Sequence, residues 1–267
     1  MKTELVKLGS FIQHGVEGPQ CGAINLIYSI LLQEHGIEHY RFIKIEQVDN
    51  SIEADVLFNM NGAGTVSIVV PYPAPPDYEQ RTTRERDLIR LDIVHRGLLL
   101  LAQKDRRVDV VVLELIRQQV IDRDFSFEIN YKVFPAPKDN NLIGKIVIHP
   151  QEDKFDFYVI VERSGQHVCR ALIYSGMTFD YFDELFYYGK WKKTDELTIK
   201  GKKSQTVVHL LIDTCTVTYK NDSKFEKDPL FEFYKAGLSK ADRNRAYEHL
   251  MQSLPPHIGG AGSTGLN

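Results

Sequence analysis

The sequence is poor in the features that mark secreted, membrane-spanning or metal-binding proteins. Its three cysteines, Cys21, Cys169 and Cys215, are far apart and show no CxxC spacing, which argues against a disulfide framework and against a zinc site. No apolar run approaches the roughly 20 residues that span a bilayer, and the opening KTELVKLGSF lacks the long apolar core of a signal peptide. We therefore expect a cytoplasmic protein with no membrane association and no bound metal.

Neither sign of charge is in large excess. The formal net charge of the 267 residues is -3, which gives no general attraction to nucleic acid or to an anionic membrane, although a local basic patch remains possible. Hydrophobic residues make up 43% and charged residues 26%, as is usual for globular proteins. The length is enough for one large domain or two small ones, with a sizeable core.

The main fold signal lies in residues 125–219. The segment FSFEINYKVF alternates apolar and polar residues, and this predicts a strand with one solvent-exposed face. The apolar face would consist of Phe125, Phe127, Ile129, Tyr131 and Val133. Similar segments follow, separated by turn-like clusters, so we expect an antiparallel β-meander. The expected strands are 125–134, 142–149, 154–163, 167–174, 194–200, 205–213 and 214–219.

The N-terminal part shows both helical and strand patterns. Helices are expected over 22–34, 78–103 and 110–121, and strands over 4–12, 40–48, 52–60 and 65–72. Asp77 is the expected N-cap of the long helix, and a buried strand is the alternative for 110–121 because of its valines. The three strands between residues 40 and 72 could share the sheet of the meander.

These elements predict an α+β fold, in which the meander packs with helices from the N-terminal half and with a C-terminal helix at about 240–253. Residues 1–124 would form an N-terminal α/β part that contains a Pro-rich connector at 71–76. Residues 125–220 would form the antiparallel sheet, in one continuous unit with the first part. The remaining residues, 221–267, would hold the C-terminal helix and a disordered tail.

A glycine-rich turn at 61–64 contains the pattern GxG, but it joins two expected strands. A dinucleotide site requires GxGxxG between a strand and a helix. We therefore exclude that class of site and expect no cofactor. The sequence also contains no phosphate-binding loop.

Cys21 is the best candidate for a nucleophile. It follows a tight turn and begins the apolar helix in GPQCGAINLIYSIL. Unpaired N–H groups at a helix N-terminus favour a thiolate. The stretch from Gln13 through Cys21 and Gly22 into this helix resembles papain-like cysteine peptidases, including the bacteriocin-processing kind. That resemblance implies that Cys21 is the nucleophile and that Gln13 helps to form the oxyanion hole.

A peptidase of this kind also needs a histidine base and a residue that orients it. The resemblance implies a histidine at the start of a downstream strand, which His167 fits best and His149 less well. Asp180 or Asp183 would then orient the histidine. The alternative is that Cys21 is a small buried residue at the start of a helix, as unpaired cysteines usually are.

The long helix carries a second group of polar residues, Glu85, Asp92 and His95. Asp92 and His95 share a face and could contribute to a metal site. Metal sites usually need three or four ligands, and no second cluster supplies them. We therefore interpret this group as an ordinary helix surface with ion pairs.

The third candidate is the aromatic segment 179–191, for which we expect a short helix or a lid. On a helix, Tyr187, Tyr188 and Trp191 would form one contiguous surface of the kind that anchors protein interfaces. The alternative is core packing at one end of the sheet.

The leading hypothesis is a non-catalytic cytoplasmic protein-interaction or inhibitor-type protein with an unidentified protein partner. A Cys-dependent hydrolase or transferase using Cys21 and His167 is the alternative.

Overall fold

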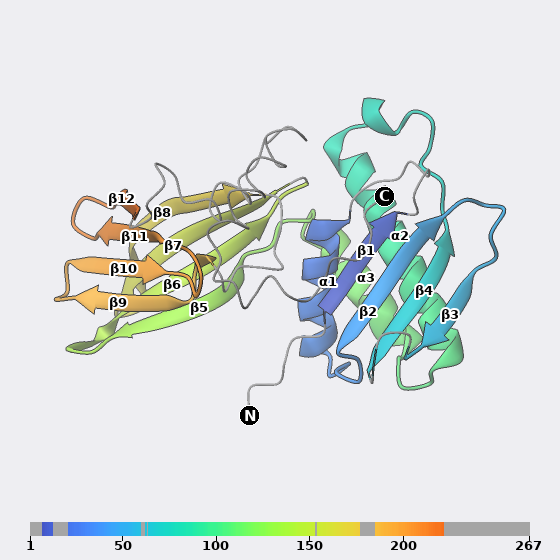
Figure 1. Ribbon diagram of the computed structural model, residues 1–267, viewed down its shortest axis with the longest axis horizontal. Helices are drawn as coiled ribbons and strands as arrows, with labels where there is room; N and C mark the ends of the chain where they lie inside the picture. Colours follow the sequence, from blue (N-terminus) through green and yellow to red (C-terminus); the bar gives the residue numbers. More distant parts are fainter. Residues whose placement is uncertain are drawn as a thin grey trace, which may run out of the picture. The chain divides into compact units, whose positions relative to one another are not determined.

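The computed structural model of the chain describes residues 7–12, 21–59, 62, 64–152, 154–176 and 185–221. The chain divides into two compact units (Figure 1), which we call unit 1, Met1–Phe127 with Pro150–Asp153, and unit 2, Glu128–His149 with Lys154–Asn267. The mixture of helices and antiparallel sheets confirms the α and β content expected from the sequence. One continuous unit stays a prediction, and the expected helix at 240–253 lies outside the described residues.

Unit 1 contains a four-stranded sheet and the three described α-helices (Figure 1). Its elements are β1 (Lys7–Ile12), α1 (Gly22–Glu34), β2 (Phe42–Val48), β3 (Asp55–Phe58), β4 (Thr65–Pro71), the 3-10 helix η1 (Tyr78–Gln80), α2 (Thr83–Lys104) and α3 (Val110–Asp122). The strand order is β1-β2-β4-β3. Strands β1, β2 and β4 run parallel, and β3 pairs antiparallel with β4.

The expectation that these strands could share the sheet of the meander is wrong, because β1 to β4 form a sheet of their own. Helix α1 connects β1 to β2, and a crossover of that length returns the chain so that the two strands run parallel. The order of strand, helix and strand was already present in the expected elements between residues 4 and 48. It is the local signal for a parallel pair.

The helices cover one face of the unit 1 sheet. Ile43 and Ile45 of β2 are fully buried on that face, whereas Lys44 and Glu46 point to the other face and form an ion pair at 2.8 Å. Gly97 of α2 permits close packing, because a Cβ at that position would lie 3.1 Å from Cδ1 of Ile45. Burial of these apolar side chains therefore holds the helical layer on the sheet.

Local side-chain hydrogen bonds determine where two of the helices begin. The expectation that Asp77 caps the long helix is wrong, because α2 begins after Thr82, which forms a capping box with Glu85. The Glu85 backbone N–H donates to Thr82 Oγ1 at 3.3 Å, and the Thr82 backbone N–H donates to Glu85 Oε2 at 2.8 Å. Helix α3 begins after Asp109, whose carboxylate accepts a backbone N–H at 2.8 Å, and it is not the alternative strand.

Unit 2 contains the expected meander as two antiparallel sheets of four strands. The first has the order β5-β6-β7-β8 and the second β12-β11-β10-β9. Their bounds are β5 (Ile129–Ala136), β6 (Asp139–Pro150), β7 (Phe155–Arg163), β8 (Gln166–Gly176), β9 (Tyr188–Lys192), β10 (Glu196–Lys200), β11 (Thr206–Leu211) and β12 (Thr216–Asn221). Strand β9 stands where we expected a helix or a lid.

A β-bulge changes the alternation that the first strand of the meander predicted. Asn130 pairs with Val147 and Lys132 with Ile146, so one extra residue, Tyr131, stands between them on β5. After the bulge the two faces exchange, and Val133, expected on the buried face, is 54% exposed. The expectation for Val133 is therefore wrong, because the bulge shifts the period of two by one residue.

One disulfide joins Cys169 of β8 to Cys215, in the turn between β11 and β12, with their Cα atoms 5.4 Å apart. It therefore connects the two sheets of unit 2, whose strands β8 and β12 lie side by side. The sequence argued against a disulfide framework, and this single bridge is a correction to that expectation. Residues 46 positions apart come together only through the pairing of the strands.

Candidate functional site

The first candidate site lies at the carboxyl ends of the parallel strands of unit 1. Cys21 occupies the N-cap of α1, which follows β1, and Gln47 lies near the end of β2. Both side chains are buried, and the Gln47 amide Nε2 donates toward the Cys21 thiol at 3.9 Å. The Cys21 side chain makes no capping hydrogen bond to α1. Ligands of open α/β sheets bind at this end of the strands.

Tyr78 of η1 and Arg90 of α2 are two further buried polar residues of unit 1. Tyr78 is 8% exposed and Arg90 is 7% exposed. In the described part of the chain, the Tyr78 hydroxyl and the Arg90 Nε have no hydrogen-bond partner. The Arg90 guanidinium carbon lies 5.7 Å from the centre of the Tyr78 ring. No motif could have found this pair, because η1 and α2 bring them together only in the folded chain.

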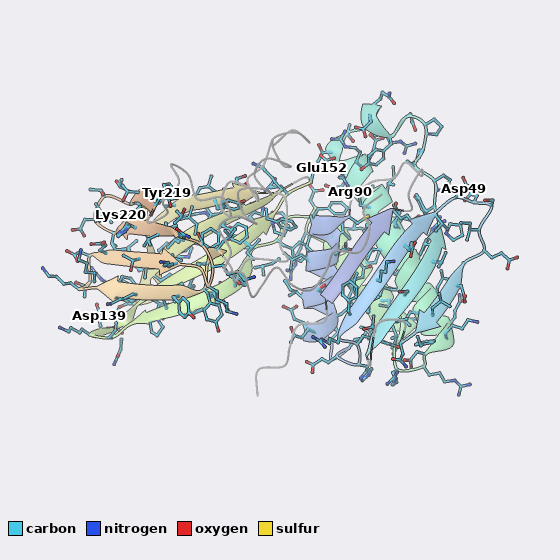
Figure 2. All side chains as sticks on the ribbon, viewed as in Figure 1. Asp49, Arg90, Asp139, Glu152, Tyr219 and Lys220 are labelled. Carbon is cyan, nitrogen blue, oxygen red and sulfur yellow. A yellow bond between two sulfur atoms is a disulfide. The ribbon has the colours of Figure 1, made fainter. Side chains whose placement is uncertain are left out.

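A network of charges fixes the position of Arg90 (Figure 2). Its Nη1 lies 2.9 Å from Asp87 Oδ1 and 2.9 Å from Glu152 Oε1. Arg86 also binds Glu152 through two N–H groups, one of them at 2.8 Å. The hydrogen bonds from Arg86, together with the smaller effect of Arg90, lower the pKa of Glu152 to about 2 against the opposing effect of burial. The two guanidinium and two carboxylate groups balance in charge when all four are ionised.

The Tyr78 hydroxyl stays protonated at neutral pH. Burial is the main cause that raises the pKa of Tyr78 to about 12, the positive charge of Arg90 opposes it, and the negative charge of Glu152 acts in the same direction as burial. At neutral pH, Tyr78 and Arg90 thus both present hydrogen-bond donors at this site.

The residues of the predicted catalytic set do not all lie in unit 1. His167 is on β8 of unit 2, where it is exposed and its Nε2 lies 3.2 Å from Glu162 Oε1. Gln13 and Asp180 lie outside the described residues, as does Asp183. The pairing of Cys21 with His167 therefore stays a prediction.

The polar group on α2 does not gather into one site. Glu85 belongs to the capping box, Asp92 pairs with Arg96 at 2.8 Å, and His95 is buried with its Nδ1 3.0 Å from the Tyr28 hydroxyl. Among the residues that the structure describes, no group of three His, Cys, Asp or Glu side chains could hold a metal ion. These residues act in capping, ion pairing and core hydrogen bonding.

Residues 188–191 of the aromatic segment lie in strand β9, so the helical geometry expected for Tyr188 and Trp191 is wrong. On a strand, successive side chains point to opposite faces. Trp191 is 8% exposed, and its Nε1 donates to the Phe134 carbonyl at 2.9 Å. Tyr188 is 59% exposed. The three aromatic residues therefore do not form one exposed surface, although a binding role for Tyr187 and Tyr188 stays a prediction.

Lysines surround the tyrosine pair. The rings of Tyr187 and Tyr188 meet edge to face with their centres 4.8 Å apart. The ammonium groups of Lys132 and Lys202 lie 4.4 and 4.1 Å from the centre of the Tyr187 ring. These distances suit cation–π contacts, so the tyrosines and lysines form one cluster.

This cluster continues onto the outward face of the sheet β9 to β12, which we call the basic face. Alternation along the four strands places on it Tyr188, Lys190, Lys192, Glu196, Thr198, Lys200, Val207, His209, Leu211, Thr216, Thr218 and Lys220. Residues 188–221 contain seven lysines against three acidic residues. The rest of the chain has 26 basic and 33 acidic residues, so positive charge is concentrated in residues 188–221, and four of the seven lysines, Lys190, Lys192, Lys200 and Lys220, lie on the basic face.

Comparison with known proteins identifies no relative. No family model, no curated protein and no solved structure matches the chain. Among the described helices, none combines the length and apolar character that crossing a membrane requires. The geometry of the two candidate sites therefore carries the functional argument.

Proposed function

We propose that the chain is a non-catalytic interaction protein that binds an acidic protein surface through the basic face of unit 2. The observation that carries this proposal is that four lysines, Lys190, Lys192, Lys200 and Lys220, share one face of a sheet in a chain with a net charge of -3. Glu196 is the single acidic residue among the twelve outward positions. Complementary charge accelerates encounter and disfavours partners of the wrong sign.

The composition of the basic face favours a protein partner over nucleic acid. Tyr188 and Leu211 expose apolar surface between the lysines, at 59% and 44%. Single-stranded nucleic acid binds to sheets that present several aromatic rings for base stacking. Tyr188 is the one aromatic ring among the outward positions, apart from the imidazole of His209.

A charge reversal tests this proposal. Lys200 lies opposite Tyr188 on the basic face, whereas Lys138 is an exposed lysine in the turn between β5 and β6. A partner captured from the host extract would be purified and its affinity measured by titration. Lys200→Glu should weaken binding at least about tenfold, and Lys138→Glu, with the same change in net charge, should weaken it far less. Equal effects of both variants would contradict the assignment.

A second arm separates the two classes of partner. Wild-type protein would be titrated with a fluorescent single-stranded oligonucleotide at about 0.15 M salt. We do not expect saturable binding of the oligonucleotide that is lost in the Lys200→Glu variant. If the oligonucleotide bound tightly and Lys200→Glu abolished that binding, the basic face would be a nucleic-acid surface, and the proposal of a protein partner would be wrong.

Tyr188 is the expected anchor of the interface. Its ring is exposed at the edge strand β9, and it packs against Tyr187. Tyr188→Ala should weaken binding of the partner by about 2 kcal/mol if it is a hot spot. The unfolding midpoint should change little, because an exposed side chain contributes little to folding. A large loss of stability without a loss of affinity would contradict this role.

The second candidate function is a Cys-dependent hydrolase or transferase. The position of Cys21 at the start of α1, with the Gln47 amide directed at its sulfur, favours this candidate. Iodoacetamide at pH 6 should label Cys21 rapidly if the thiolate is the nucleophile, and His167→Ala should slow that labelling. Slow labelling that is unchanged by His167→Ala would reject this function.

A further inference from the structure

The three buried tyrosines in the described part of unit 1 differ in whether the hydroxyl group has a hydrogen-bond partner. The Tyr28 hydroxyl lies 3.0 Å from His95 Nδ1, and the Tyr40 hydroxyl donates to the Asp105 carboxylate. Tyr78 is buried to a similar degree, but its hydroxyl has no partner among the described residues. A buried hydroxyl without a partner destabilises the folded state, because the hydrogen bonds it made to water are not replaced. The Tyr78 hydroxyl therefore lowers the stability of the folded protein.

Arg90, which lies beside Tyr78, has a second buried donor without a hydrogen-bond partner. Its Nη1 is held by Asp87 and Glu152, which leaves the Nε–H group buried without an acceptor in the described chain. The side chain lies next to the Tyr78 ring, and Figure 2 shows it beside Glu152. Two adjacent buried groups that lack a partner indicate an acceptor from outside the chain.

We propose that the carboxyl end of the unit 1 sheet binds a small molecule that carries an oxyanion, held by Tyr78 Oη, Arg90 Nε and the N-terminus of α1. Both side-chain groups donate hydrogen bonds at neutral pH, so their common partner is an acceptor. The first turn of α1, which the Cys21 side chain does not cap, adds backbone N–H groups and a favourable dipole. This site is separate from the basic face and does not depend on the proposed function.

The charge balance indicates the kind of oxyanion. Arg86 and Arg90 are matched by Asp87 and Glu152, so the site supplies hydrogen bonds rather than a large positive field. A singly charged group, a carboxylate or a phosphate monoester or diester carrying one charge, fits this balance. Acetate is the probe for a carboxylate ligand, and inorganic phosphate is the probe for a phosphate ester.

Cys21 provides a reporter for occupancy. Among the described residues it is the cysteine outside the disulfide, and it occupies the N-cap of α1, whose first turn belongs to the proposed site. A molecule bound at this first turn would cover the thiol. Alkylation of Cys21 by iodoacetamide should therefore slow several-fold when the probe is bound, and this readout does not require any enzymatic activity.

The experiment uses the full chain at pH 7 and constant ionic strength, with acetate or phosphate replacing chloride. One of the two probes should raise the unfolding midpoint of the wild-type protein with saturation and should slow alkylation of Cys21. Tyr78→Phe should keep or raise the midpoint of the probe-free protein, because no hydrogen bond is lost and a buried hydroxyl without a partner is removed. The variant should need at least about tenfold more probe for the same response, the factor that about 1.4 kcal/mol of binding energy represents.

Tyr40→Phe is the matched control, since it removes an equally buried hydroxyl. It should lower the midpoint of the probe-free protein, because the hydrogen bond to Asp105 is lost, and it should keep the wild-type response to the probe. An equal response of Tyr78→Phe and wild type would overturn the proposal by showing general salt stabilisation. Loss of stability in probe-free Tyr78→Phe would also overturn it, since the hydroxyl would then have a partner such as a buried water. So would the absence of any response to both probes.

Discussion

Trp191 of β9 donates a hydrogen bond from its indole Nε1 to the main-chain carbonyl of Phe134 on β5, at 2.9 Å. These strands are edge strands of the two sheets of unit 2, so this bond connects the sheets where their backbones do not pair. We expect blue-shifted tryptophan emission that moves to longer wavelength on unfolding. Trp191→Phe should lower the free energy of unfolding by about 1–3 kcal/mol. Tyr188→Phe is the control and should leave it unchanged. Emission typical of an exposed indole would contradict the buried position.

Gly189 lies next to Trp191 and faces Phe134. A Cβ at this position would lie 2.3 Å from the Phe134 ring, so the ring could not keep its place. Gly189→Ala should therefore lower the free energy of unfolding by about 1–3 kcal/mol through overpacking. Urea denaturation would measure the loss, with Lys190→Ala on the outward face as a control. Equal stability of the two variants would show that the sheets do not approach each other at this point.

The disulfide between Cys169 and Cys215 should contribute strongly to the stability of unit 2. It closes a loop with a sequence separation of 46, which restricts the unfolded chain. Reduction should cost about 2–4 kcal/mol of unfolding free energy. A double variant, Cys169→Ser with Cys215→Ser, should show the same loss and no further response to dithiothreitol. If dithiothreitol also destabilised that variant, the loss of stability on reduction would not come from this disulfide.

Glu152 should make stability depend on pH in the acidic range. Its pKa is about 2 in the folded protein and 4.5 ordinarily, mainly because Arg86 donates hydrogen bonds to its carboxylate. A lowered pKa stabilises the folded state above pH 4.5, and this contribution disappears as the pH falls toward 2. Glu152→Gln should therefore be less stable than wild type at pH 7, and the difference should shrink between pH 4.5 and 2.

Equilibrium urea unfolding at several pH values would follow this difference. Glu128→Gln is the control, because Glu128 forms an exposed pair with Arg170 that should contribute less than about 1 kcal/mol. A stability difference between Glu152→Gln and wild type that grew below pH 4.5 would contradict the assigned role of Glu152.

Local patterns in the sequence were sufficient for several elements. The helices expected over 22–34 and 110–121 correspond to α1 and α3, because periodic apolar residues and local caps depend only on near neighbours. The antiparallel meander was also predicted. Its turn at Ser164-Gly165 has two residues with positive φ, which a short polar residue before glycine often permits. These features depend on residues a few positions apart.

Contacts between distant residues decided the rest. The bulge at Tyr131 exists only where β5 pairs with β6, and it turned Val133 outward. Trp191 is buried because its indole packs against Phe134 and Gly144 of the other sheet, although the same residues would suit a helix surface. The grouping of Cys21, Tyr78 and Arg90 required a folded parallel sheet, since no spacing along the chain encodes it. Long-range packing selects among local conformations of similar free energy, so the candidate site emerged from the tertiary structure.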